Sequence, residues 1–181
     1  NTNNCDIYGG LYQWGELMQY ATAEESQGIC PDGWHIPSDG ELCQLETFLD
    51  TLISCQTTGW SGVNGGGKMK DVDTILWQSP NIGATNSSGF TAVPGGYRTI
   101  YGGPNFYDLH LYITIWSSTQ YNGMRAYNHE INYNRADILR MDNIKNSGYS
   151  VRCIKDSFSS CDTVSVTIST PNETICDSNC I

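Results

Sequence analysis

The chain has few charged residues, and basic residues are scarce among them. Of its 181 residues 15% are charged, with 9 Lys and Arg against 19 Asp and Glu. The formal net charge of −10 excludes nucleic acid as a partner, because binding to a phosphate backbone needs clustered Lys and Arg. The same charge disfavours an anionic membrane surface as a partner.

Long hydrophobic runs are also absent. No stretch of apolar residues approaches the ~20 that are needed to span a bilayer, so we expect no membrane insertion. The chain begins with polar residues at Asn1 and has no signal-peptide pattern there. We therefore expect a mature or internal piece of a longer protein.

Motifs for catalysis and for metal binding are missing as well. Gly65–Gly67 lacks the spacing of a phosphate-binding loop, and we interpret it as a flexible turn. Spacing supports no Ser–His–Asp or Cys–His arrangement, and we expect His35 to hydrogen-bond to backbone in a rigid corner. Glu130 and Asp137 could be paired carboxylates, but solvated strand residues are the simpler interpretation. We expect no enzyme, no cofactor and no metal.

The 8 cysteines form an even set that predicts a disulfide framework in an oxidising compartment. Zinc is the competing interpretation, which is weak because there is no CxxC pair. Eight cysteines can pair in many ways, and the alternatives stay open. The pairs that we favour are Cys30–Cys153, Cys43–Cys55, and either Cys176–Cys180 or Cys5–Cys161.

The stretch Gly28–Asp39 is the part around which the chain is organised. It contains a cysteine, prolines, glycines, a tryptophan and a histidine, which together indicate a fixed corner. Ser38 or Asp39 can cap a helix, which we predict over 38–54. We expect Ser150–Lys155 to be the closing partner, with a bond between the cysteines of the two stretches worth ~4 kcal/mol or somewhat more.

Helical patterns come early in the chain and strand patterns come late. A strand running into a helix is expected at 11–20, before the helix at 38–54. Strands are expected at 89–98, 109–118, 126–131, 136–140 and 148–155. Their short polar turns predict an antiparallel sheet in one domain, residues 1–156. A linker, a strand at 163–169 and a cysteine-containing tail are expected within residues 157–181.

Several pieces of the chain, in this order, resemble the Fibrobacter succinogenes major paralogous domain, a family of secreted and surface modules. The pieces are Tyr8–Trp14, Gly28–Asp39, Gly89–Arg98, Trp116–Thr119 and Ser150–Lys155. The resemblance implies an α+β, C-type-lectin-like fold with two early helices and twisted antiparallel sheets, here linked by disulfides and followed by a β extension. Cys43, Cys55 and the extension after Asp156 depart from the family pattern.

Tyrosine, asparagine and arginine crowd the late strands, which are the ligand surface that the resemblance implies for lectin-like domains. Such side chains combine rigid ring area with adaptable hydrogen bonds. The candidate ligand-binding residues are Trp116, Tyr121, Asn122, Arg125, Tyr127, Asn128, Asn132, Tyr133, Asn134, Arg135 and Asp137. The alternative is an ordinary polar face of a sheet. The calcium motifs of sugar-binding lectins lack the needed carboxylates here.

Short triplets mark candidate glycosylation sites. Asn86 and Asn172 fit the N-glycosylation pattern. Thr51, Thr74 and Thr163 lie in Asp-Thr-apolar triplets, which resemble the O-glycosylation pattern of Bacteroidota.

These observations predict a secreted or cell-surface, non-enzymatic adhesion module of a bacterial surface protein that binds a carbohydrate or protein ligand. The alternative is a structural subunit of an extracellular fibre, in which the strand at 163–169 joins copies of the chain into a homo-oligomer.

Overall fold

Helices and antiparallel strands are mixed in the fold, and a computed structural model describes residues 2–73, 75–99 and 105–156. The helices are α1 (Thr2–Tyr8), α2 (Trp14–Leu17), α3 (Asp39–Leu49) and α4 (Gly65–Met69). The strands are β1 (Trp34–His35), β2 (Gly59–Ser61), β3 (Tyr97–Thr99), β4 (Asn105–Tyr107), β5 (Tyr112–Gln120), β6 (Arg125–Asn132), β7 (Ile138–Ile144) and β8 (Ile154–Lys155). None of the helices in these ranges is long and apolar enough to cross a membrane.

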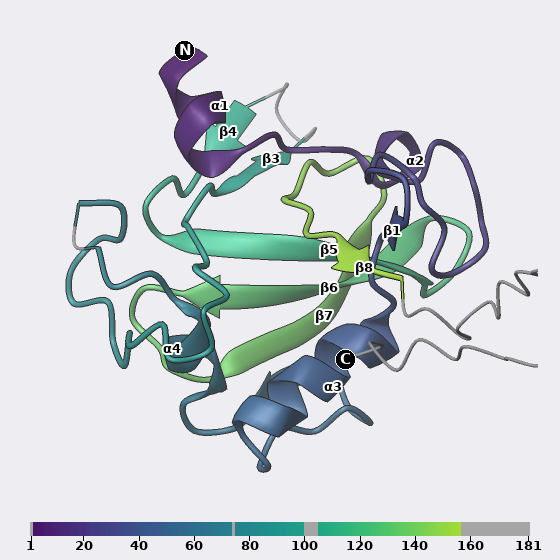
Figure 1. The fold of residues 1–181 in the computed structure, drawn as a ribbon. Helices are drawn as coiled ribbons and strands as arrows, with labels where there is room; N and C mark the ends of the chain where they lie inside the picture. Colours follow the sequence, from purple (N-terminus) through teal and green to yellow (C-terminus); the bar gives the residue numbers. More distant parts are fainter. Residues whose placement is uncertain (1, 74, 100–104, 157–181) are drawn as a thin grey trace, which may run out of the picture.

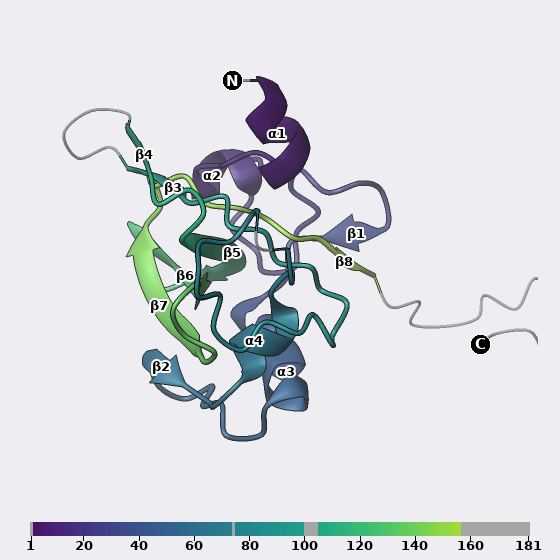
Figure 2. The ribbon, with the colours of Figure 1, turned by 90° about the vertical axis from the view of Figure 1, so that its left-hand side faces the viewer.

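A four-stranded sheet in the order β2-β7-β6-β5 forms the centre of the fold, and its paired strands are antiparallel (Figure 1). Two small antiparallel pairs, β1-β8 and β3-β4, lie beside it. Helix α3 packs against β5 and β6, and Figure 2 shows α3 and α4 together on one side of the sheet. Helix α2 covers part of the other side of the sheet, where its Trp14 and Leu17 pack with Trp116 of β5.

Helix α3 begins where the sequence predicted and ends earlier. Ser38 is the N-cap, and its side chain and that of Glu41 form a reciprocal capping box. The helix ends at Leu49 instead of residue 54, because Asp50 adopts an extended conformation. The Asp50 carboxylate then accepts hydrogen bonds from the backbone amides of residues 63–65, which precede and begin α4.

The interpretation of Gly65–Gly67 as a flexible turn was wrong, because these glycines are buried in α4. A Cβ atom at Gly66 would lie 2.5 Å from the carbonyl oxygen of Asp137, and one at Gly67 would lie 2.3 Å from that of Gly83. Only glycine fits here, since two backbone segments approach the helix too closely for any side chain.

The expected closure of Gly28–Asp39 against Ser150–Lys155 is present. Strand β1 pairs antiparallel with β8, and a disulfide bond joins Cys30 to Cys153 beside them. The expected bond between Cys43 and Cys55 is also present. Cys5 is an exposed thiol without a disulfide partner among the described residues. Cys161, Cys176 and Cys180 lie outside those residues, so their pairing stays a prediction.

Two of the expected strands are much shorter than predicted. Within 89–98 regular pairing begins only at Tyr97, and the carbonyl oxygen of Ala92 instead accepts a hydrogen bond of 2.9 Å from the Trp77 indole nitrogen. The stretch 148–155 forms isolated bridges before it pairs as β8. Side chains and single bridges satisfy the backbone in both stretches, so alternation alone overestimated their strand content.

The core divides into two clusters, one on each face of the central sheet. The first consists of Trp14, Leu17, Met18, Cys30, Ile36, Trp116, Ala126 and Tyr149. The second consists of Ile53, Met69, Trp77, Ala92, Ile113, Ile115, Ile131 and Ile138. The β5 strand contributes to both clusters, so it links the two halves of the fold.

Candidate ligand-binding site

Side chains alternate between the two faces of the central sheet. On the face toward α3, His129 and Arg140 contact Asp39. The register pairs Thr114 with Glu130, and Glu130 with Leu139, on the opposite face. That face forms the floor of a hollow, to which the strands contribute Tyr112, Thr114, Glu130, Leu139, Met141 and Asn143.

The hollow has a volume of about 460 Å³, and its walls come from the ends of β6 and β7 and from three segments outside these strands. These wall residues are Tyr97, Thr99, Asp108, Arg125, Ile144, Ser147 and Tyr149. Gly96 has a φ of +67°, and a Cβ atom there would lie 2.2 Å from the carbonyl oxygen of Tyr107. Glycine thus lets the β3-β4 pair close tightly beside the sheet. A bridge between Arg98 and Gly148 joins the β3-β4 pair to the segment that contributes Ser147 and Tyr149 to the walls.

Tyrosine rings make one wall of the hollow rigid. The rings of Tyr97 and Tyr149 meet edge to face with their centroids 6.2 Å apart. Tyr149 also packs against buried Trp116 at 4.6 Å, and Tyr97 stacks on Tyr107 at 5.8 Å. Rings that are fixed by packing offer a preformed surface to a ligand at little cost in conformational entropy.

Two carboxylates, Asp108 and Glu130, line the hollow. Burial, together with the negative charge of Asp108, raises the pKa of Glu130 to about 7. Arg125 also lines the hollow, but its Nε donates to the Asp142 carboxylate and its terminal nitrogen donates to the Asp142 carbonyl oxygen at 2.6 Å. The arginine charge is therefore already compensated, and the remaining charge in the hollow is acidic.

Three of the residues predicted to bind a ligand are buried, so in this structure they offer almost no surface to a ligand. Trp116 and Asn128 have no exposed surface, and Asn132 is 5% exposed. Trp116 belongs to a hydrophobic cluster, where its indole nitrogen donates to the Tyr12 carbonyl oxygen at 3.0 Å. Tryptophan and asparagine in a strand can serve the core as well as a surface, and composition did not distinguish the two.

The other predicted residues do not form one surface. Tyr121, Asn122 and Arg125 lie at one end of β6, whereas Tyr133, Asn134, Arg135 and Asp137 follow its other end. A strand of 8 residues separates the two groups, a length of roughly 25 Å. Tyr127 lies on the α3 face beneath the Arg140 guanidinium, 4.3 Å from its ring centroid. Of the predicted set only Arg125 lines the hollow.

Sequence reasoning missed most of the hollow, although one signal was available. In β5 the apolar residues Ile113 and Ile115 alternate with Tyr112 and Thr114, which indicates a second, more polar face. That alternation could have been used to predict the polar sheet face that forms the floor of the hollow. The walls come from segments far apart in the sequence, so no local pattern could have found them. The sequence allows a carboxylate pair of Glu130 with Asp137, although solvated strand residues are its simpler interpretation. In the structure Glu130 lines the hollow, and Asp137 forms an ion pair with Arg135.

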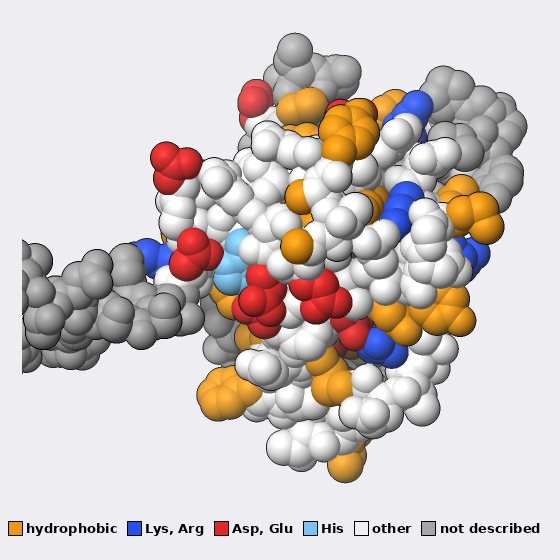
Figure 3. All heavy atoms as spheres, turned by 90° about the vertical axis from the view of Figure 1, so that its right-hand side faces the viewer, with side chains coloured by type: hydrophobic (Ala, Val, Ile, Leu, Met, Phe, Trp, Pro, Cys, Tyr) orange, Lys and Arg blue, Asp and Glu red, His pale blue; other side chains and the backbone are white. Residues whose placement is uncertain are grey.

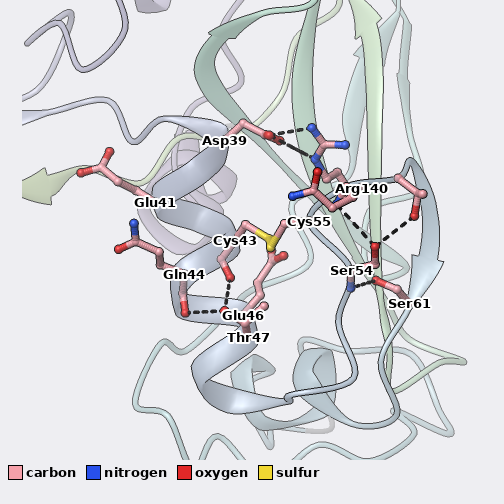
Figure 4. The surroundings of a disulfide bond; sticks show 12 residues. Asp39, Glu41, Cys43, Gln44, Glu46, Thr47, Ser54, Cys55, Ser61 and Arg140 are labelled. Carbon is pink, nitrogen blue, oxygen red and sulfur yellow. Dashed lines mark hydrogen bonds and ion pairs between the residues drawn. A yellow bond between two sulfur atoms is a disulfide. The ribbon is translucent and has the colours of Figure 1, made fainter.

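A buried ionic cluster joins α3 to the sheet on the face opposite the hollow. The Nε and a terminal nitrogen of Arg140 donate to the Asp39 carboxylate, and Figure 4 shows this pair close to the Cys43–Cys55 bond. His129 bridges Asp39 at 3.0 Å and Glu46 at 2.7 Å. The charges satisfy one another with little exposure to solvent, so we assign the cluster to the stability of the fold.

The expectation that His35 bonds to backbone was wrong. Its Nδ1 lies 2.6 Å from the Asp156 carboxylate and its Nε2 lies 3.1 Å from that of Glu41. These two partners raise the pKa of His35 against the opposing effect of burial. Figure 3 shows acidic side chains gathered beside a histidine on the side of the molecule that carries β1 and β8. The contact fixes the end of β8 to the start of α3.

Within the described ranges, no group of three or more His, Cys, Asp or Glu residues is arranged to hold a metal ion. Of the candidate glycosylation sites, Thr51 is exposed, and the Asn86 side chain makes two hydrogen bonds to Thr91. Thr74, Thr163 and Asn172 lie outside the residues that the structure describes.

Comparison with known families gave one match. The family model of the Fibrobacter succinogenes major domain matches residues 1–155. The chain belongs to this family. Comparisons with curated proteins and with solved structures gave no match.

The pieces that resemble the Fibrobacter succinogenes major domain have identifiable structural roles. Gly28–Asp39 and Ser150–Lys155 form the β1-β8 closure with its disulfide bond. Trp14 and Trp116 meet in one hydrophobic cluster. Gly96 shapes the wall of the hollow. Most of the pieces that carry the resemblance therefore build the scaffold. Only Gly89–Arg98, which contains Gly96, lies beside the candidate site.

Proposed function

We propose that this chain is an extracellular, non-enzymatic adhesion module that binds carbohydrate in the hollow over β5, β6 and β7. The observation that carries the proposal is the composition of the hollow. Rigid tyrosine rings stand beside carboxylate, amide and hydroxyl groups in a space of about 460 Å³. Ligand sites commonly combine apolar surface with a few placed polar groups in this way.

The chemistry of the hollow suits a sugar ring. A sugar presents C–H groups on its ring faces, which pack on aromatic surface such as that of Tyr97 and Tyr112. Its hydroxyl groups donate to carboxylates and bond to amides such as that of Asn143. An open hollow on a rigid sheet also fits adhesion, because it can admit one unit of a longer glycan.

The C-type-lectin-like fold and the extracellular location form part of this proposal. Early helices, antiparallel sheets and a disulfide bond that joins Cys30 to Cys153 support the fold assignment. Two disulfide bonds support an oxidising compartment. A surface role is compatible with the acidic net charge of −10, which keeps modules apart from one another.

A fibre subunit remains the alternative function. It depends on the strand expected at 163–169, which lies outside the described residues, and on contacts between copies of the chain. Light scattering of the full chain tests it: assembly that grows with concentration supports the fibre, and a constant monomer mass contradicts it.

Glycan-panel binding by the full chain and by two variants tests the carbohydrate site. Tyr97→Ala removes a ring from the hollow, and we expect at least about tenfold weaker binding, because one buried aromatic contact is worth about 1.4 kcal/mol or more. Tyr121→Ala is the matched control, since Tyr121 is 53% exposed and does not line the hollow. We expect it to bind like the wild type.

The reverse result, loss with Tyr121→Ala alone, would place recognition at the turn between β5 and β6. Tyr97→Phe keeps the ring, and it should retain most of the affinity if stacking dominates. Thermal unfolding of each variant checks that the fold is intact. Absence of binding to every glycan on the panel would contradict the carbohydrate proposal.

A further inference from the structure

The charge of the hollow restricts its ligand further than its shape does. Asp108 and Glu130 face the hollow, while the nearest cation, Arg125, is bonded to Asp142 at its edge. No lysine lines the hollow within the described residues. A neutral ligand would leave Asp108 and Glu130 without a counter-charge, so that Glu130 could ionise beside Asp108 only at a cost in free energy.

The cost in free energy arises mainly at Glu130, because this carboxyl group is fixed on the floor of the hollow. Its carboxyl group hydrogen-bonds with Thr114 and Asn132, which hold it in place on the floor. Burial and the charge of Asp108 both disfavour its ionised form, so its pKa rises to about 7. A cation placed between the two carboxylates would remove the repulsion and let both groups ionise.

The tyrosine walls favour a cation as well. Ring faces carry partial negative charge and attract ammonium groups within about 6 Å of the centroid. Tyr97 and Tyr149 are held edge to face by packing, and Tyr112 lines the same space from β5. Aromatic walls around a pair of carboxylates therefore form a pocket that suits a protonated amine better than a hydroxyl group.

We propose that the hollow selects a sugar with a free, protonated amino group, whose ammonium lies between the carboxylates of Asp108 and Glu130. This inference rests on the proposed carbohydrate-binding function and names the ligand class of that site. Acetylation of the amine would remove both its charge and two of its donor hydrogens, so an N-acetylated sugar should bind more weakly.

The test compares two probes that differ only in acetylation: a β-1,4-linked glucosamine trimer and its fully N-acetylated form. Calorimetric titration of the full chain at about 0.15 M salt limits non-specific attraction between the acidic protein and the basic trimer. We expect the free-amine trimer to bind at least tenfold more tightly, and Asp108→Asn to abolish most of this difference.

Asp32→Asn is the matched control, because it removes the same charge from an exposed residue that does not line the hollow. It should keep the preference for the amine, and if it loses the preference to the same extent as Asp108→Asn, the attraction is non-specific and the inference fails. Equal or tighter binding of the N-acetylated trimer also overturns the inference. In that case Tyr97→Ala still decides the proposed function, since loss of binding would keep a neutral sugar in the same hollow.

Discussion

At the scale of single residues, several polar groups are buried where composition would place them on the surface. Lys70 is fully buried at the end of α4, and its ammonium donates to the carbonyl oxygens of Ile82, Asn132 and Arg135 at 2.7–2.9 Å. It thereby joins the loop before Gly83 to the end of β6. No sequence pattern reveals this role, because a lysine that follows a glycine-rich stretch looks like an ordinary surface residue.

Replacement of Lys70 by methionine should destabilise the fold by about 3 kcal/mol, because three buried carbonyl groups lose their donor. Lys68→Met is the matched comparison, since Lys68 donates to a single carbonyl oxygen, that of Leu49. We expect a loss of about 1 kcal/mol there. Urea unfolding of both variants measures the two losses, and equal losses would contradict the role assigned to Lys70.

At the scale of elements, sequence patterns located α3 and the strands β5 to β7 but not what holds them together. The capping residue and the runs of β-branched residues are local signals, and they were sufficient for these elements. The buried face of α3, however, carries Asp39, Cys43 and Glu46 instead of a purely apolar stripe. The partners of Asp39 and Glu46 are His129 in β6 and Arg140 in β7, which lie 83 to 101 residues away in the sequence. Such polar packing has no periodic signal in the sequence.

The ionic cluster between α3 and the sheet predicts a pH dependence of stability. Glu46 and Asp39 raise the pKa of His129 from 6.5 to about 9, against the effect of burial. The folded state therefore favours the protonated ring, so this contribution is complete below pH 6.5 and is lost as the pH rises through 9. The full loss is about 3 kcal/mol. Lys70 changes in the opposite sense, because burial lowers its pKa from 10.5 to about 8.

A comparison of variants separates the two effects. Urea unfolding between pH 6 and 10 should show that His129→Gln lacks the loss between about pH 6.5 and 9 that the wild type has. His110→Gln, outside the cluster, should keep the wild-type profile. If His129→Gln loses stability with pH as the wild type does, then His129 is not the group responsible.

At the scale of the whole molecule, the sequence predicted how the chain closes but not where its hollow lies. Closure depends on two dense local stretches, each with its own cysteine, and both could be recognised. The hollow depends on Gly96, Tyr149 and the register of three strands, which meet only in the folded chain. The predicted ligand-binding residues therefore lie on or next to the strands that form the floor of the hollow, but mostly at their ends and in their buried positions.

The two disulfide bonds should differ in their effect on the stability of the whole fold. The Cys30–Cys153 bond closes a separation of 123 residues, whereas the Cys43–Cys55 bond closes one of 12. The chain-entropy relation then gives losses of about 5 and about 3 kcal/mol when each pair is replaced by serine. The β1-β8 ladder that adjoins the first bond has only two residue pairs, so it adds little to the closure. Thermal unfolding of Cys30→Ser/Cys153→Ser and Cys43→Ser/Cys55→Ser compares the losses directly. A larger loss from the second pair would mean that α3, and not the junction of β1 with β8, limits the stability of the fold.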